Sequence, residues 1–414
     1  MVDVAERIAA LESAEVLRNP PRGGRVWEFP AEMPKVRWVF EAGLPDPETF
    51  PIEDLSAFTD DVLRHDAADG LQYGGVASNS ILYGYEGLRD LIAERTLRRE
   101  GREVDRRSVM LTLGGVQAIS LATRAFLDAG DTIAVEAPTW GATLSAARNA
   151  GAEAVAIPMD ADGMIVDELA REVERLSADG RSLKLVYTIA TFNTPTGWSL
   201  SQARREQLVD LAERHGFLVL EDNVYGELRY DGEEIPTLFS LDRSGLVVKI
   251  DSFSKILAPA LRLGWVTGDP EAIRAMGVVR GDLGVSQWIA RVVARFMRDG
   301  KLEPHIASVN ARYREKRDVA VAALREHCGP WVRFDVPEGG FFIWVELAPE
   351  VDGQQAMMKA LAEGVVCRPG ERFFGDTDAD VAKQWFRLNF TMIGIGEIER
   401  GIAALGSAIA ASVR

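Results

Sequence analysis

Residues 251–262 combine a lysine, two serines and an arginine in a pattern suited to covalent chemistry. Lys255 follows the serines of a Ser-x-Ser pair, Ser252 and Ser254, and Arg262 lies seven residues further along the chain. A lysine amine forms a Schiff base with a carbonyl carbon, while hydroxyls and a guanidinium bind phosphate oxygens. The segment therefore suits a phosphorylated aldehyde attached to Lys255. A surface lysine in a β-loop is the alternative for this motif taken alone.

A second anion-binding feature lies at residues 109–117. The apolar run at 109–113 predicts a strand, two glycines follow it, and a helix is predicted to begin directly after them. Free amide groups and the dipole at a helix N-terminus attract a phosphate group. The spacing is not the G-x-G-x-x-G fingerprint of dinucleotide-binding domains. A tight strand-to-helix turn without a ligand is the alternative here.

Strands and helices alternate in the prediction for residues 105–270, which indicates a mostly parallel sheet covered on both faces. In such sheets ligands bind at the loops that follow the carboxyl ends of the strands. The candidate residues that come directly after predicted strands are Trp140, Thr194, Asp222, Tyr225 and Lys255. We therefore expect them to share one site.

The chain is expected to be an α/β protein with a smaller α+β unit at its C-terminus. Residues 1–60 are interpreted as an arm and a segment that joins the small domain, 61–290 as the large domain, and 291–414 as the small domain. Gly43 lies in a turn-rich stretch and permits close approach of another group to the backbone. A plain loop is the alternative for that stretch.

Composition argues against several other classes of protein. The formal net charge is −16, which disfavours nucleic acid or an anionic membrane as partner. Two cysteines give no disulfide framework or zinc pattern and fit a reducing cytoplasm. Four scattered histidines argue against a metal site, and no apolar run of about twenty residues indicates a membrane span.

Taken together, these motifs resemble the fold-type I pyridoxal 5′-phosphate (PLP) enzymes of the class I/II aminotransferase family, in particular its aminoadipate and aromatic branch. The resemblance extends from Gly43 to the last predicted helix. It implies PLP as the cofactor, an L-α-amino acid as the substrate, and a homodimer with shared active sites.

The resemblance assigns four residues to the cofactor ring. Lys255 would form the Schiff base and later transfer the proton, and Asp222 would pair with the pyridinium nitrogen. Tyr225 would donate to the phenolic oxygen of the ring, and Trp140 would stack on its face. A helix cap for Asp222 and a core position for Trp140 are the alternatives.

The resemblance also assigns the cofactor phosphate and the substrate carboxylate. The phosphate would be bound by the amides of Gly115 and Val116 together with Ser252 and Arg262, and Tyr83 would reach it from the partner subunit. The α-carboxylate would be bound as a bidentate pair by Arg387, an arginine in a predicted strand.

Four stretches depart from the family pattern. Gly115 and Val116 stand where members carry a Ser and a Gln after the phosphate-loop glycine. Residues 193–197 read Asn-Thr-Pro-Thr-Gly where members carry Asn-Pro-Thr-Gly, so Thr194 takes the place of the asparagine beside the phenolic oxygen. Residues 42–43 are Ala-Gly in place of Gly-Gly. The loop at 368–372, usually neutral, carries Arg368, Glu371 and Arg372.

The leading hypothesis is an aminotransferase. β- or γ-elimination, replacement or oxidative deamination with the same cofactor is the first alternative. A ligand-sensing domain of a transcription regulator is the second, and it is disfavoured because the first forty residues are short and not strongly basic for a DNA-binding domain. The sequence does not specify which amino acid is the substrate.

Overall fold

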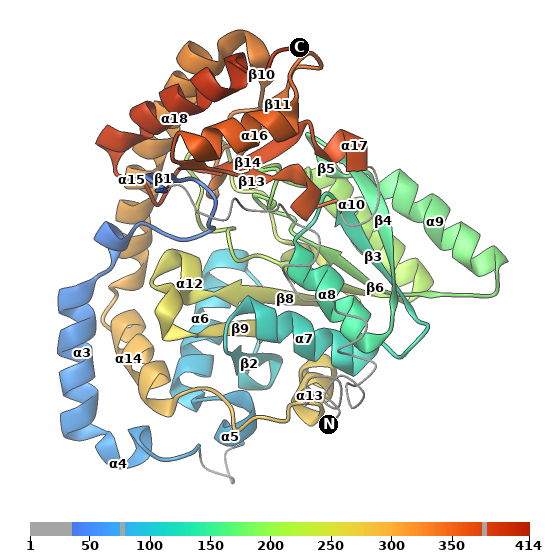
Figure 1. Ribbon diagram of the computed structural model, residues 1–414. Coiled ribbons are helices and arrows are strands. Elements are labelled where there is room, and N and C mark those ends of the chain that lie inside the picture. Colours follow the sequence, from blue (N-terminus) through green and yellow to red (C-terminus); the bar gives the residue numbers. More distant parts are fainter. Residues whose placement is uncertain (1–34, 75–78, 375–378) are drawn as a thin grey trace, which may run out of the picture.

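The computed structural model describes residues 35–74, 79–374 and 379–414. The N-terminal helix and loop predicted before residue 35 lie outside these ranges. The described chain forms a large sheet flanked by helices, with a smaller sheet and its helices packed at one end (Figure 1). The expected α/β architecture with a small α+β unit is confirmed, while the domain boundaries remain a prediction.

The large sheet has eight strands in the order β2-β9-β8-β7-β6-β3-β4-β5. Its strands are β2 (Val109–Thr112), β3 (Thr132–Ala137), β4 (Glu153–Asp160), β5 (Gly163–Met164), β6 (Leu183–Thr188), β7 (Leu218–Asp222), β8 (Val247–Ser252) and β9 (Gly264–Thr267). The pairs formed among β3, β4, β6, β7 and β8 are parallel, and the pairs made by β2, β5 and β9 are antiparallel. Every residue of β2 and β8 is buried, as expected for strands covered on both faces.

Helices cover both faces of this sheet. They are α5 (Ser80–Tyr83), α6 (Glu86–Glu100), α7 (Gly115–Phe126), α8 (Gly141–Ala150), α9 (Val166–Ala178), α10 (Gln202–His215), α11 (Leu238–Leu241), α12 (Phe253–Ile256), α13 (Pro270–Val278) and α14 (Gln287–Arg298). In α9 the buried residues Val166, Leu169, Val173 and Leu176 recur at helical spacing and form its core-facing stripe. No helix within the described ranges is both long and apolar enough to cross a membrane.

The smaller unit is built on a four-stranded antiparallel sheet in the order β10-β11-β14-β13. Its elements are α15 (Leu302–Ala323), β10 (Val332–Arg333), β11 (Phe342–Leu347), α16 (Gly353–Ala362), β12 (Val365–Val366), β13 (Arg368–Pro369), α17 (Ala379–Ala382), β14 (Trp385–Asn389) and α18 (Ile395–Ala410). Strand β14 lies between β11 and β13 and pairs with both.

The N-terminal part of the described chain joins this smaller unit before it reaches the large one. Strand β1 (Trp38–Val39) pairs in parallel with β12, and α3 (Ile52–His65) packs beside α14 (Figure 1). A short helix, α4 (Ala67–Gly70), follows α3. Between β1 and α3 the chain passes over the carboxyl edge of the large sheet. We call residues 41–44 the crossing segment.

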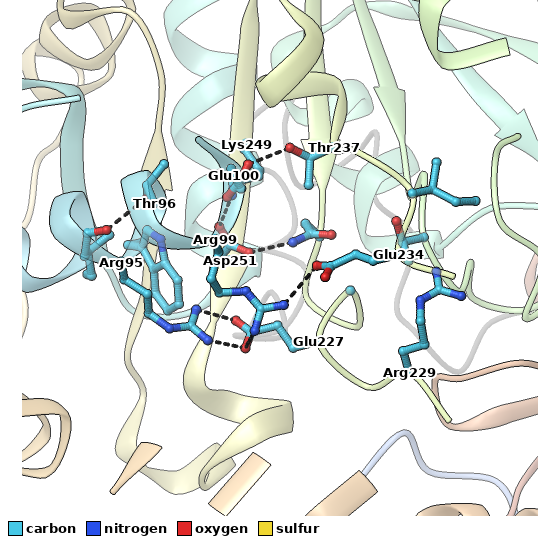
Figure 2. Close-up of a pocket in the computed structure, with 16 residues that line it drawn as sticks. Arg95, Thr96, Arg99, Glu100, Glu227, Arg229, Glu234, Thr237, Lys249 and Asp251 are labelled. Carbon is cyan, nitrogen blue, oxygen red and sulfur yellow. Dashed lines mark hydrogen bonds and ion pairs between the residues drawn. The ribbon is translucent and has the colours of Figure 1, made fainter. Parts of the chain in front are cut away.

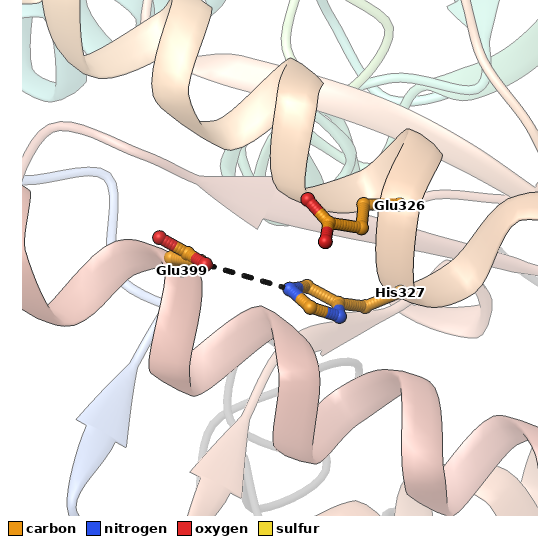
Figure 3. A group of neighbouring side chains, drawn as sticks. All are labelled: Glu326, His327 and Glu399. Carbon is orange, nitrogen blue, oxygen red and sulfur yellow. Dashed lines mark ion pairs between the residues drawn. The ribbon is translucent and has the colours of Figure 1, made fainter.

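One polar cluster lies on the surface of the smaller unit. Glu326 and His327 lie in the π-helical turn Leu324–Cys328, and Glu399 faces them from α18 (Figure 3). His327 Nε2 is 3.8 Å from Glu399 Oε1, and both glutamates are exposed. Ion pairs of this exposed kind contribute little to stability, so we interpret the cluster as a surface contact between two helices.

A buried cluster of charges supports the ends of β7 and β8 from behind. Lys249 of β8 binds the Glu100 carboxylate at the end of α6, and its Nζ lies 3.4 Å from Asp251 Oδ2 (Figure 2). Asp251 Oδ1 accepts a hydrogen bond of 2.9 Å from Asn223 Nδ2, which ties β8 to the turn after β7. Burial alone would lower the pKa of Lys249, but the two carboxylates raise it above its ordinary value.

Further ion pairs lie between this cluster and the solvent. Arg95 of α6 binds Glu227 on one side and Glu303 of α15 on the other, with N–O distances of 2.7 Å to each. The remaining cavity is about 40 Å³ and therefore has room only for water. The cluster is a structural support and not a ligand site.

Replacing Lys249 with methionine should destabilise the protein, because Glu100 and Asp251 would be left buried without their cation. Breaking a buried pair in this way typically costs about 3–5 kcal/mol of unfolding free energy. Urea titration is the suitable measurement, since urea does not screen charges. Lys184→Met, at an exposed position of β6, is the matched control. Equal losses in the two variants would contradict the supporting role.

Candidate active site

Lys255 lies at the carboxyl edge of the large sheet, in the short helix α12 that follows β8. Its Nζ donates a 2.7 Å hydrogen bond to the backbone carbonyl of Gly43 in the crossing segment. Burial lowers the pKa of the Lys255 amine to about 8, Arg387 and Arg262 act in the same direction, and Asp222 opposes them. About a tenth of the amine is thus uncharged at pH 7, far more than for an ordinary lysine, and the uncharged form is the nucleophile.

Asp222 ends β7, the strand beside β8, and is only 2% exposed. Its Oδ2 accepts a 2.7 Å hydrogen bond from the Tyr187 hydroxyl, and Oδ1 accepts one of 3.3 Å from the Val224 amide. Burial raises the pKa of this carboxyl to about 6. Within the described ranges no cationic side chain forms an ion pair with it. The carboxylate therefore has room for one cationic partner.

A phosphate-sized cradle lies beside α12. Gly115 and Val116 begin α7, so their amides are free of helical partners. Arg262 lies over the preceding turn, where its Nη2 would be 3.0 Å from a Cβ at Gly114. Gly114 also has a φ of +90°, so both this backbone conformation and the nearby guanidinium favour glycine there. Ser252 caps α12 by accepting a 3.1 Å hydrogen bond from the Ser254 amide, and both hydroxyls are buried here.

Aromatic residues form the walls of the site. Tyr225 is buried, and its ring packs edge-on against Phe341 and Phe342 with centroids 5.4 and 5.5 Å away. The Lys255 amine lies 5.7 Å from the centre of the Tyr225 ring. Trp140 precedes α8 directly after β3 and is half-buried. Burial raises the pKa of the Tyr225 hydroxyl, which keeps this group a hydrogen-bond donor.

Arg387 enters the site from β14 of the smaller unit and is 5% exposed. Its guanidinium lies between the rings of Phe342 and Phe373, at 4.0 and 5.0 Å from their centres. Nη1 donates a 2.9 Å hydrogen bond to Thr194 Oγ1 and Nη2 one of 2.6 Å to the Glu41 carbonyl. Its buried Nε has no hydrogen-bond partner among the described residues. Burial lowers the pKa of Arg387 to about 9, so an anion bound here would be stabilised strongly.

The crossing segment closes the site from the N-terminal side. Besides the Gly43 and Glu41 carbonyls, the Ala42 carbonyl accepts a hydrogen bond from Asn389 Nδ2 of β14. A Cβ on Gly43 would approach the Phe342 ring to 3.1 Å, which explains the glycine. Three side chains from two sheets thus hold one short stretch of backbone.

Two residues that the sequence analysis did not single out shape the site. Tyr187 lies inside β6 and orients Asp222. Glu136, in β3, is buried and accepts hydrogen bonds from Thr188, the Ile189 amide and Asn193. Asn193, one residue before Thr194, donates this hydrogen bond from Nδ2 at 2.7 Å. The sequence feature that could have identified them is the presence of a tyrosine and a glutamate inside otherwise apolar strands.

Tyr83 is the one candidate that the structure does not bring to this group. Its ring lies under the Arg89 guanidinium, 5.3 Å from the ring centre, and beside Gly277 of α13. The other candidates lie in the crossing segment, at or after the ends of β2, β3, β6, β7 and β8, before β9, and in β14. A contribution of Tyr83 to the site would have to come from another copy of the chain.

The residues present fit PLP. The cradle of amides, hydroxyls and Arg262 suits a phosphate, and the amine of Lys255 suits an aldehyde. The buried Asp222 carboxylate without a cation suits a protonated ring nitrogen.

Comparison with known proteins also points to a PLP enzyme. The family model described as aminotransferase class I and II matches residues 59–405. An aromatic-amino-acid aminotransferase from Thermococcus litoralis is 38% identical over 369 residues, covering 89% of this chain and 86% of that protein. The structure of a kynurenine aminotransferase from Pyrococcus horikoshii has a TM-score of 0.91 at 34% identity and covers 100% of both chains.

A third similar protein was solved with a cofactor derivative. The α-aminoadipate aminotransferase of Thermus thermophilus, complexed with N-(5′-phosphopyridoxyl)-L-leucine, has a TM-score of 0.85 at 28% identity, with 98% of both chains covered. The resemblance inferred from the motifs is confirmed. The chain therefore belongs to the class I and II aminotransferase family, as a fold-type I enzyme that uses PLP.

Proposed function

We propose that this aminotransferase transfers the amino group of an L-α-amino acid to a 2-oxo acid at the site formed by Lys255, Asp222 and Arg387. The observation that carries this assignment is the environment of Lys255. Its amine donates to Gly43 of the crossing segment, Arg387 donates to Glu41 of the same segment, and Asp222 ends the strand β7 that pairs with β8. A carboxylate-binding group and a ring-binding group therefore flank one nucleophile.

Each residue has a task that follows from its surroundings. PLP, when bound, supplies an electron sink for the bond-breaking step at the amino-acid α-carbon. Asp222, oriented by Tyr187, holds the proton on the ring nitrogen. The Lys255 amine, with its pKa lowered to about 8, accepts and returns the proton between the α-carbon and the ring.

Other residues bind and orient. Arg387, held by Thr194, offers two N–H groups to the α-carboxylate once the Glu41 carbonyl is displaced. Tyr225 donates to the ring oxygen, with Thr194 as the second neighbour in the place of an asparagine. Trp140 covers the ring face, and the aromatic walls exclude water.

We also propose a homodimer whose active sites are shared. Four large apolar side chains that flank α5 are strongly exposed, namely Leu71 (67%), Tyr73 (70%), Val278 (71%) and Leu283 (56%). Exposed apolar groups gathered in one region mark interaction surfaces. The residue that the sequence analysis assigned to a partner's site, Tyr83, ends the helix at the centre of this region.

Both cysteines are buried free thiols, which fits a reducing cytoplasm.

The reaction is tested by mass spectrometry of products from an amino-acid panel, with and without 2-oxo acids. A transaminase gives stoichiometric oxo-acid and amino-acid products only when an acceptor is present. Arg387→Leu should reduce kcat/KM by about a hundredfold or more, since a charge-assisted bidentate pair is lost. Turnover of an amino acid without an acceptor would indicate elimination or oxidation instead.

The attachment of PLP to the apo-protein should depend on pH through Lys255. Only the uncharged amine reacts, so the rate should rise about tenfold per pH unit below the pKa of about 8 and level off above it. Visible absorbance follows the reaction. Borohydride reduction and peptide mapping should then place the pyridoxyl group on Lys255. The matched control is Lys249 in β8, whose pKa is raised by its carboxylate neighbours despite burial. A pyridoxyl label on Lys249 would contradict the assignment.

Mixing two defective variants tests the shared sites. Lys255→Ala lacks the anchoring amine, and Tyr83→Phe lacks the hydroxyl proposed to reach the partner's phosphate. In a two-fold symmetric dimer each hybrid contains one intact site, so random mixing should restore about a quarter of wild-type sites. If exchange of subunits is demonstrated and no activity is regained, Tyr83 does not act across the interface.

A further inference from the structure

Arginines outnumber carboxylates at the mouth of the site. Arg368 of β13 is the direct Cα partner of Arg387 in the antiparallel pair with β14, so the two side chains project from the same face of the sheet. Arg368 Nη2 lies 2.8 Å from Glu41 Oε1, while the Glu41 carbonyl accepts from Arg387. One residue of the crossing segment thus holds both guanidiniums.

Glu41 does not satisfy Arg368 completely. The Nε of Arg368 is buried without a hydrogen-bond partner among the described residues, although the side chain as a whole is 33% exposed. Arg372 lies close enough to Arg368, Glu41 and Glu371 for all three to influence its pKa, which burial lowers. Leaving a buried N–H unpaired is costly. The guanidinium of Arg368 therefore has a donor left for a second anion.

The opposite flank of Arg387 is filled by the protein itself. Trp344 of β11 is the Cα partner of Arg387 on that side, stacks on Trp385 with centroids 5.4 Å apart, and meets Phe373 edge-on. Trp344 and Phe373 are 4% and 3% exposed. A substrate whose α-carboxylate is bound by Arg387 finds no space there. The flank on the side of Arg368 is not filled in this way, since that side chain is 33% exposed.

We propose that Arg368 binds the distal carboxylate of a short dicarboxylic substrate, and that Glu41 holds Arg368 until that carboxylate replaces it. The proposal rests on the proposed function, because it takes Arg387 as the site of the α-carboxylate. Directly opposite residues in an antiparallel pair have Cα atoms about 5 Å apart, which suits the two carboxylates of a four- or five-carbon diacid. Arg368 is paired with a carboxylate in both states, and the displaced Glu41 side chain, already 37% exposed, is solvated by water.

Binding of two five-carbon acids to the holoenzyme tests this directly. Glutarate carries two carboxylates and pentanoate only one, and calorimetry measures both without turnover. Arg368→Leu should weaken glutarate binding at least about tenfold and change pentanoate binding less than about twofold. Glu41→Gln should act in the opposite direction and tighten glutarate binding, because the competing carboxylate is gone. Arg333→Leu, on the far edge of the same sheet, is the matched control.

The signs of the two effects decide the outcome. A purely structural ion pair would make Arg368→Leu and Glu41→Gln weaken binding together, and that result would overturn the proposal. Equal effects on glutarate and pentanoate would overturn it as well. Arg368→Lys retains the charge without the bidentate geometry and should fall between wild type and Arg368→Leu.

Turnover separates this proposal from the proposed function. With one amino donor, kcat/KM for 2-oxoglutarate should fall about tenfold or more in Arg368→Leu, while the value for pyruvate stays within about twofold. Equal losses for the two acceptors would overturn the role of Arg368 and leave transamination intact. Absence of turnover with every acceptor in the wild-type enzyme would overturn the proposed function itself.

Discussion

Burial of charge at the carboxyl edge of β7 and β8 is the constraint on which the rest of the structure depends. Asp222 and Lys255 are withdrawn from water, which raises the pKa of the carboxyl to about 6 and lowers that of the amine to about 8. Neutral dipoles compensate each group: the Tyr187 hydroxyl and the Val224 amide donate to Asp222, and the Gly43 carbonyl accepts from Lys255. A rigid parallel sheet and the ion cluster around Lys249 keep these dipoles in place. The fold thus maintains two groups whose full partners come only with cofactor and substrate.

The crossing segment is where the two sheets meet over this site. Its carbonyls accept from Lys255 of the large sheet and from Arg387 and Asn389 of the small one. A neutral carbonyl is a weaker acceptor than a carboxylate, so a substrate anion competes successfully for Arg387. The backbone that accepts from Arg387 therefore also accepts from Lys255, so an anion that displaces the Glu41 carbonyl acts on the stretch that contacts the amine.

The strand-and-loop pattern predicted the edge of the sheet where the site lies, because Asp222 and Lys255 follow apolar strands directly. It did not reveal Tyr187 or Glu136, which lie inside strands and whose partners depend on the order of neighbouring strands. Thr194 shows the same limit. Its ring-oxygen contact stays a prediction, whereas its hydroxyl accepts from Arg387, 193 residues away in the chain. Such long-range pairs are set by packing of the two units and leave no local signature.

With the roles proposed for Arg387 and Arg368, the small sheet would bind the α-carboxylate and the substrate side chain on two neighbouring strands. Arg387 is fixed between two rings and by Thr194, so its position depends on the core. Arg368, one strand further out, is partly exposed and held mainly by Glu41. A change at Arg368 alters charge at the mouth, while the Phe342 contact and the Thr194 hydrogen bond of Arg387 involve neither Arg368 nor Glu41. This arrangement explains how one scaffold can retain its chemistry while side-chain preference varies, since specificity then lies at an edge strand and not in the packed centre.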